Sequence, residues 1–121
     1  MSDSVIIIED DDEIRDALRE VLEHEGFPVT TYRNGKEALE GLPKVARPGL
    51  ILLDLMMPIM DGWQFMRCRT QLPDSHASVP VVLVSAVADY KKALETGAAG
   101  FLRKPVDLDV LLQTVKHHYG T

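Results

Sequence analysis

Three carboxylates stand at the ends of apolar runs, and together they suit a divalent cation. Glu9 and Asp10 directly follow the run at 5–8, and Asp54 ends the run at 50–54. Carboxylates held about 5 Å apart repel one another by roughly 3 kcal/mol per pair at an effective dielectric constant near 20. The group therefore requires raised pKa values or a bound cation. Because oxygen ligands without Cys or His favour a hard ion, we expect Mg²⁺, with Mn²⁺ as a substitute.

A hydroxyl and an amine stand at comparable positions. Ser85 ends the apolar run at 79–85, and Lys104 lies at the exit of the run at 99–105. If these runs are parallel strands, their carboxyl ends meet at one edge of a sheet, where α/β proteins place their sites. We therefore expect Ser85 and Lys104 to join the three acids, although Lys104 also fits a solvated lysine in a turn.

The acids that come next along the chain have a simpler interpretation. Asp11, Asp12 and Glu13 precede an apolar stripe at helical spacing, formed by Ile14, Ala17, Leu18, Val21 and Leu22. Acidic side chains cap and favour the start of a helix because its exposed amides carry partial positive charge. We assign these three acids to the helix start, and Glu9 and Asp10 to the metal.

The whole chain alternates between strand patterns and helix patterns. Strand patterns lie at 5–8, 50–54, 79–85 and 99–105, and a short strand is expected around 29–32. Helix starts are marked by Asp11 or Asp12, Asn34, Asp61, Asp89 and Asp107, with capping boxes at Asn34–Glu37 and Asp61–Gln64. The last helix has an apolar stripe at Leu108, Leu111, Leu112 and Val115. Five strands alternating with five helices predict one three-layer α/β domain over 1–121, with a parallel sheet.

Composition and charge narrow the class of protein. The 121 residues are 45% hydrophobic and 26% charged, as in a soluble globular domain. The net charge of −6 argues against direct nucleic-acid binding, which needs clustered Lys and Arg. No apolar run has the length of a membrane span and the acidic start does not resemble a signal peptide. The single cysteine, Cys68, fits a reducing compartment, so we expect a cytoplasmic protein.

Motifs of several other classes are absent from the sequence. It contains neither of the glycine-rich patterns of common nucleotide sites, GxGxxG and GxxxxGK[ST]. It also lacks HExxH and GxSxG, which argues against a zinc protease or a serine hydrolase. Asp10, Asp12 and Ile14 do not continue as a calcium-binding loop, which needs glycine at its sixth position.

Taken in order, these residues resemble the receiver domain of two-component response regulators over nearly the whole chain. The matching features are the acidic pair Glu9–Asp10, the stretch LLDLMMPIMDGWQF with Asp54 at the phosphoacceptor position, VLVSA with Ser85 at the hydroxyl position, and GAAGFLRKP with Phe101 and Lys104 at the aromatic-switch and lysine positions. The resemblance implies a flavodoxin-like fold with strand order 2-1-3-4-5. It also implies a cis peptide bond before Pro105.

The resemblance further implies a reaction at Asp54. This side chain would accept a phosphoryl group from the phosphohistidine of a histidine kinase or of a histidine phosphotransfer protein. Mg²⁺ held by Asp10, Asp54 and the backbone carbonyl of Met56, with Glu9 helping directly or through water, would offset the repulsion between two anions. Lys104 would neutralise another phosphoryl oxygen, as in phosphoryl transfer generally.

In this family the phosphate becomes a signal through packing. The resemblance implies that Ser85 would bind the phosphate, that the loop after the fourth strand would move inward, and that Phe101 would turn into the space left free. The output is the surface of the fourth helix, the fifth strand and the fifth helix, which contacts a downstream protein, an output domain or a second copy in a phosphorylation-dependent homodimer. Phe101 has no hydroxyl, so its switch works by packing alone. The segment from Ser85 to Lys104 is shorter than usual by about one helical turn, which predicts a short fourth helix and an altered output surface.

Two side chains near the expected site predict a long-lived phosphorylated state. Met56 and Val87 lie two positions after Asp54 and Ser85, and both are apolar. Apolar groups at these positions hinder an attacking water, so we expect the phosphoryl group to be lost slowly.

Two other functions fit parts of the same pattern. A receiver-like module that binds partners without phosphate would not need the complete set of Asp10, Asp54, Ser85 and Lys104. A Mg²⁺-dependent phosphohydrolase with an aspartyl-phosphate intermediate usually carries an acid two residues after its nucleophile, where this chain has Met56. We therefore expect a signalling domain whose only chemistry is self-phosphorylation and slow self-dephosphorylation. The chain's end shortly after the last helix suits a stand-alone module and equally one domain of a longer protein.

Overall fold

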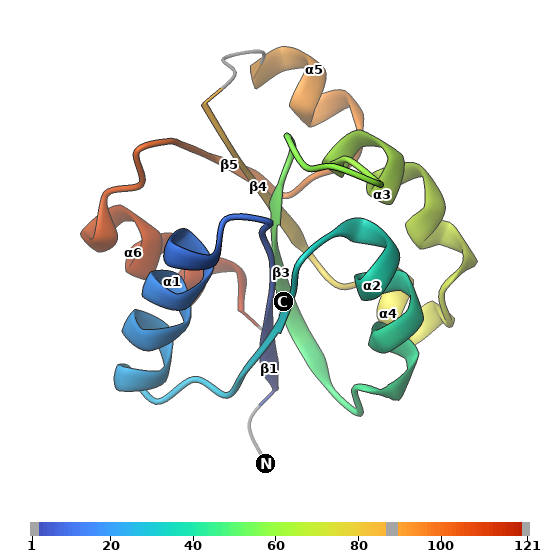
Figure 1. Ribbon diagram of the computed structural model, residues 1–121. Coiled ribbons are helices and arrows are strands. Elements are labelled where there is room, and N and C mark those ends of the chain that lie inside the picture. Colours follow the sequence, from blue (N-terminus) through green and yellow to red (C-terminus); the bar gives the residue numbers. More distant parts are fainter. Residues whose placement is uncertain (1–2, 87–89, 120–121) are drawn as a thin grey trace.

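The computed structural model describes residues 3–86 and 90–119, and one five-stranded parallel sheet lies at its centre (Figure 1). The strand order is β2-β1-β3-β4-β5, as expected. The strands are β1 (Ser4–Ile8), β2 (Val29–Tyr32), β3 (Pro48–Asp54), β4 (Val81–Ser85) and β5 (Gly100–Arg103). The chain adds β2 on one side of β1 and β3 on the other. The carboxyl ends of β1 and β3 therefore border the crevice in which open α/β sheets bind their ligands.

Helices cover both faces of this sheet, which gives the predicted three-layer arrangement. α1 (Asp12–His24) and α6 (Leu108–His118) pack on one face, at the left of Figure 1. The other face carries α2 (Gly35–Gly41), α3 (Gly62–Cys68), α4 (Asp74–Ala77) and α5 (Tyr90–Glu95). Two short 3-10 turns, Leu42–Lys44 and Arg69–Gln71, follow α2 and α3.

Both faces of β1 and β3 are buried, which explains the uninterrupted apolar runs at 5–8 and 50–53. The side chains that join the core under α2 and α3 include Ile6, Ile8, Ile51 and Leu53. Those in the core under α1 and α6 include Val5, Ile7, Leu50 and Leu52. Each of these eight side chains is at most 1% exposed. A shift of one residue would exchange the two faces, so the core fixes the points at which both strands end.

The helix starts lie where the capping pattern predicts. The capping side chains are Asp11 rather than Asp12 for α1, Asn34 for α2, Asp61 for α3 and Asp107 for α6. Asp61 and Gln64 form both halves of the capping box. The box predicted at Asn34 is only half formed, because the Glu37 carboxylate accepts from the Arg33 amide at 3.4 Å and pairs with the Arg33 guanidinium at 2.9 Å. An ion pair has thus replaced the second half of the box.

Two strands are shorter than their apolar runs. β4 begins at Val81 rather than at 79, because the Val79 amide donates to the His76 carbonyl at 3.3 Å in a turn that ends α4. β5 ends at Arg103, before the Lys104–Pro105 peptide bond, which is cis as the resemblance implied. Proline has no amide hydrogen, so it cannot extend the ladder.

The helices differ from the expectation in number and in detail. α4 was not predicted, because its four residues are too few to show a helical stripe. Leu108, assigned to the apolar stripe of the last helix, is 48% exposed. The fourth helix of the prediction is α5, which has six residues and is short as expected, while its predicted capping residue Asp89 lies outside the described residues. None of the helices in the described ranges has the length and apolar character needed to cross a membrane.

A strained turn lies in the loop between β3 and α3. The Met60 amide donates to the Pro58 carbonyl at 2.7 Å, which closes a three-residue turn around Ile59. Ile59 has a φ of 70°, a region that a β-branched residue rarely adopts. This is the rarer form of the γ-turn, and no core contact explains the choice of isoleucine, whose side chain is 75% exposed.

Replacing Ile59 by asparagine should stabilise the protein. Asparagine tolerates a positive φ far better than isoleucine, and little buried apolar surface is lost, so we expect the free energy of unfolding to rise by about 1 kcal/mol. Urea denaturation of Ile59→Asn measures this. Val110→Asn is the matched control, because Val110 is also an exposed apolar residue, at 46%, but lies in regular helix. A loss of stability in Ile59→Asn would contradict the proposed strain.

Candidate functional site

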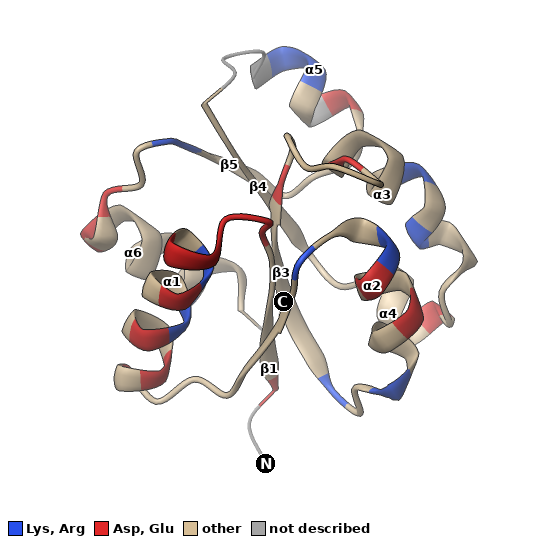
Figure 2. Cartoon of the chain, viewed as in Figure 1, with Lys and Arg blue, Asp and Glu red and all other residues tan. Residues whose placement is uncertain are grey.

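The three acids predicted to bind a metal meet at the carboxyl edge of the sheet. Glu9 and Asp10 follow β1, and Asp54 ends β3, the neighbouring strand. One carboxylate oxygen from each lies within 4.8 Å of the others. Figure 2 shows the acidic segment after β1 beside the end of β3. The register of the two central strands therefore creates the cluster that the sequence predicts.

Glu9 is buried, and its backbone amide and both carboxylate oxygens are hydrogen-bonded. It is 2% exposed, and its amide donates to the Tyr32 carbonyl at the end of β2 at 3.1 Å. One carboxylate oxygen accepts from the Asp11 amide at 3.2 Å, and the other accepts from Lys104 at 2.8 Å. A buried carboxylate is stable only with such partners. These contacts leave Glu9 less open to a metal than Asp10, which is exposed.

Lys104 brings positive charge to the acidic cluster. Its amino group lies 2.8 Å from Glu9 Oε1 and 3.5 Å from Asp54 Oδ2, and its side chain is 20% exposed. Desolvation, the largest single influence, lowers the pKa of Lys104, but the hydrogen bonds and charges of Glu9 and Asp54 outweigh it and raise the pKa. Lys104 is therefore fully charged at neutral pH. The interpretation of Lys104 as a solvated turn lysine is wrong.

Asp54 holds its proton unusually tightly. Burial is the largest cause, and a hydrogen bond and the negative charge of Glu9 add to it, which raises the pKa of Asp54 to about 7. The charge of Lys104 and the Met56 amide, which donates to Oδ1 at 3.2 Å, act in the opposite direction. One ammonium group thus does not balance the carboxylates around it. The predicted response to crowded negative charge, a raised pKa, is present.

The donor set fits a hard divalent cation. All three side chains offer carboxylate oxygens, and Asp10 and the neighbouring Met56 are exposed, so the group is open on the solvent side. Mg²⁺ uses one or two carboxylates and keeps several waters, which this open side allows. A second positive charge would also relieve the repulsion that raises the pKa of Asp54. The residues present are therefore suited to Mg²⁺ or Mn²⁺.

Gly62 holds the loop after Asp54 close to the sheet. Its amide donates to the Leu55 carbonyl at 2.9 Å, and a Cβ at this position would lie 2.6 Å from the backbone oxygen of Asp54. Any other residue would push the start of α3 away from the end of β3. Gly62 therefore lets the loop pack closely against the end of β3, where Asp54 lies.

Ser85 lies on β4, the strand next to that of Asp54, and Phe101 lies one strand further out, on β5. Ser85 ends β4, is fully buried, and its carbonyl accepts from the Lys104 amide at 2.9 Å. Phe101 pairs with Leu83 in the ladder between β4 and β5, and its half-buried ring packs against the core under α2 and α3. Both residues thus occupy the predicted strand positions, and Val87 lies outside the described residues.

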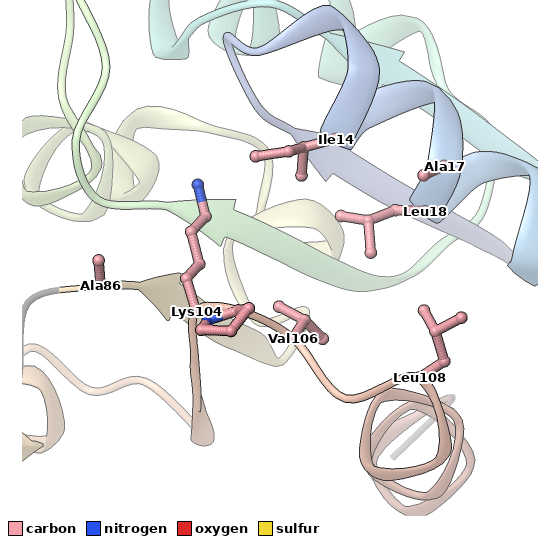
Figure 3. A pocket seen from close by; sticks show the side chains of 8 residues that line it. Ile14, Ala17, Leu18, Ala86, Lys104, Val106 and Leu108 are labelled. Atoms are coloured by element: carbon pink, nitrogen blue, oxygen red, sulfur yellow. The ribbon is translucent and has the colours of Figure 1, made fainter.

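An apolar pocket adjoins the acidic cluster. It has a volume of about 490 Å³ and lies between the start of α1 and the segment after β5 (Figure 3). Its lining includes Ile14, Leu18, Val106 and Leu108, and Lys104 lies on its rim with the amino group bound to Glu9 and Asp54. Carbon atoms cannot compensate the charge of a phosphate. This pocket therefore suits an apolar group and not a phosphate.

One contact at the site was missed from the sequence. Arg15 in α1 donates from its guanidinium to the Glu9 carbonyl at 3.1 Å. The sequence gives one signal for it, a cation in a helix turn that otherwise carries acids. That signal does not reveal the contact, because the direction of a side chain depends on how the helix packs.

Comparison with known proteins covers nearly the whole chain. The family of the response regulator receiver domain matches residues 5–116. The transcriptional regulatory protein CrdR of Helicobacter pylori is 37% identical, over 99% of this chain and 56% of that protein. The transcriptional regulatory protein CseB of Streptomyces coelicolor is 39% identical, over 93% of this chain and 47% of that protein. This chain thus spans about half the length of these curated relatives.

A solved structure shows the same fold. The chemotaxis protein CheY4 of Vibrio cholerae has a TM-score of 0.88 at 30% sequence identity, and the match covers 98% of this chain and 99% of that chain. The predicted flavodoxin-like architecture is confirmed.

The raised pKa of Asp54 predicts a stability that falls with pH in the absence of divalent cations. Between an ordinary value of 3.8 and about 7, the folded protein keeps a proton that the unfolded chain has lost, so the free energy of unfolding falls as pH rises through this range. The full shift corresponds to about 4 kcal/mol, and screening by water reduces this to about 2 kcal/mol. Asp54→Asn should therefore be about 2 kcal/mol more stable than the wild type at pH 8, and much closer to it at pH 4.

Urea denaturation in EDTA at both pH values measures this difference. Asp16→Asn is the matched control, because Asp16 lies on α1 with a side chain that is 52% exposed, so its replacement should leave the pH dependence unchanged. An Asp54→Asn effect of equal size at pH 4 and pH 8 would refute the assignment.

Proposed function

Because this chain belongs to the family of response regulator receiver domains, we propose that Asp54 accepts a phosphoryl group from the phosphohistidine of a histidine kinase or of a histidine phosphotransfer protein. The observation that carries the proposal is the convergence of Glu9, Asp10 and Asp54 within 4.8 Å, with the Lys104 amino group 3.5 Å from Asp54. A buried carboxylate that faces an open, cation-binding edge is suited to attack a phosphoryl group.

Asp54 is the nucleophile. Its carboxylate oxygen forms a bond to phosphorus as the bond between phosphorus and the imidazole nitrogen of the donor breaks, and the imidazole keeps the electron pair. The attacking carboxylate needs no general base, unlike a serine hydroxyl. The Met56 amide, 3.2 Å from Oδ1, holds the carboxylate in place during this exchange.

Asp10, Asp54 and the backbone carbonyl of Met56 would hold Mg²⁺ or Mn²⁺, with Glu9 acting through water. Glu9 takes this outer role because both of its oxygens are already bound, to the Asp11 amide and to Lys104. When bound, the ion offsets the charge of the incoming phosphoryl group and favours the ionised form of Asp54.

Lys104 supplies the second positive charge. Its ammonium group lies between Glu9 and Asp54, so a short rotation of its flexible side chain would bring it from Glu9 to a phosphoryl oxygen. Its raised pKa keeps it charged throughout. On phosphorylation, Lys104 would thus exchange the Glu9 carboxylate for the phosphoryl group as its anionic partner.

The signal would leave the site through the outer strands. We propose that the Ser85 hydroxyl binds the phosphate and that Phe101 repacks in response, which alters the surface of α5, β5 and α6. α5 has only six residues, so this surface is smaller than one with a longer helix at the same place. Its partner or dimer would therefore differ from that of receiver domains with a longer helix. Its target is a downstream protein, an output domain in a longer chain, or a second copy. The setting is the cytoplasm, where phosphohistidine donors act, and neither nucleic acid nor membrane is a direct partner of this domain.

Phosphorylation at Asp54 is directly testable. Incubation with acetyl phosphate and Mg²⁺ should add one phosphoryl group, about 80 Da, to the wild type and none to Asp54→Asn, as measured by intact mass. Asp61→Asn is the matched control, because Asp61 is a partly exposed cap of α3 that asparagine can replace, and it should be labelled like the wild type.

Two results would favour the alternatives. No label on the wild type would support the phosphorylation-independent interaction module. Continuous hydrolysis of small phosphoesters would support the phosphohydrolase.

The phosphorylated form should persist for minutes or longer. Met56, two residues after Asp54, is 62% exposed but apolar, so it offers no hydrogen bond to an attacking water. Met56→Asn provides such a bond and should shorten the half-life by about tenfold in a phosphate-release assay, within the usual range for positioning a water or proton. A wild-type half-life of seconds would contradict the prediction.

A further inference from the structure

Arg15 lies where a helix disfavours a cation. α1 begins at Asp12, so Arg15 is its fourth residue, close to the positive end of the helix dipole. A long charged side chain usually extends into water from such a position. The Arg15 side chain is instead only 13% exposed. Its contacts with the rest of the protein therefore hold it there.

Those contacts join the helix to the acidic loop. One guanidinium nitrogen donates to the Glu9 carbonyl at 3.1 Å, and another donates to the Asp12 carboxylate. A planar guanidinium offers donors in fixed directions, so it can bind both acceptors at once, which a lysine ammonium does less well. Arg15 therefore ties the first turn of α1 to the backbone that leaves β1.

The Glu9 carbonyl is the point that determines the direction of Asp10. This carbonyl and the Asp10 amide belong to one planar peptide group, so an acceptor fixed at the carbonyl also fixes the bond from which Asp10 departs. The preceding peptide is fixed as well, because the Glu9 amide donates to the Tyr32 carbonyl at 3.1 Å. With Arg15 in place, the backbone on both sides of Glu9 is held.

We infer that Arg15 is a positioning residue for the divalent-cation site, which it serves by holding the Glu9–Asp10 peptide so that Asp10 faces Asp54. The inference rests on the proposed function of the acidic cluster. By its charge alone Arg15 would weaken the binding of a cation, although Asp12 neutralises much of that charge. A geometric role and a purely electrostatic role therefore predict opposite effects when Arg15 is replaced.

The test measures Mg²⁺ affinity by calorimetric titration of the unphosphorylated protein. Arg15→Lys keeps the charge and loses the fork, and Arg15→Gln loses both. We expect both to bind Mg²⁺ about tenfold more weakly, the usual size for a partner that orients a ligand. Arg19→Gln is the matched control, since Arg19 lies one turn further along α1 with a side chain that is 41% exposed, and it should bind within about twofold of the wild type.

A second readout needs no metal. In EDTA, the amides of Asp10 and Asp11 should exchange with deuterium faster in Arg15→Lys than in the wild type, while those of β3 exchange alike. Thermal unfolding identifies any variant that fails to fold. Arg15→Lys is the more conservative of the two variants, because it keeps the positive charge.

The outcomes separate the inference from the function it rests on. Wild-type affinity in Arg15→Lys, or tighter binding in Arg15→Gln, would overturn the positioning role and leave the metal site standing. A wild type that does not bind Mg²⁺ would overturn both.

Discussion

Excess negative charge at the ends of two buried strands is the constraint on which this structure depends. Glu9 and Asp54 are each at most 3% exposed, and a single ammonium group, that of Lys104, lies between them. This pairing joins residues 95 positions apart, so it exists only when the whole sheet has formed. One positive charge is too little for three carboxylates, and the pKa of Asp54 is raised by its burial first and by the nearby Glu9 carboxylate second. This excess of negative charge makes the site receptive to a divalent cation.

The proposed site draws its residues from inner strands and from an edge of the sheet. The acids stand on β1 and β3, whose side chains are buried on both faces and whose register cannot shift without exchanging them. Ser85, Phe101 and Lys104 belong to β4, to β5 and to the segment that follows β5, and β5 is an edge strand. An edge strand has one neighbour fewer, so a change there disturbs less of the core. Under the function proposed above, Asp54 would lie on a strand that is held on both sides, and the surface that changes would include the edge strand β5.

The acids and the serine of the proposed site could be located from the sequence because each ends or directly follows an apolar run. The runs at 5–8 and 50–54 identify strands, and the polar residue that follows each run marks the functional edge. Caps such as Asp61 were predictable because they act on amides three residues away. α4 was not predicted, because four residues are too few to show a helical period. The role of Glu37 was predicted wrongly, because Arg33, four residues earlier, binds its carboxylate instead. Arg15 was missed because its acceptor is a backbone carbonyl, which has the same chemistry in every residue.

The sequence by itself determined the order of strands and helices, the residues at each strand end and the chemical class of the site, because these depend on local period and side-chain type. Only the tertiary structure decided the distances between charges, the burial of Glu9 and the pKa of Asp54. Those quantities arise from groups brought together across the sheet, and Coulomb energy and desolvation depend on separation in space rather than along the chain.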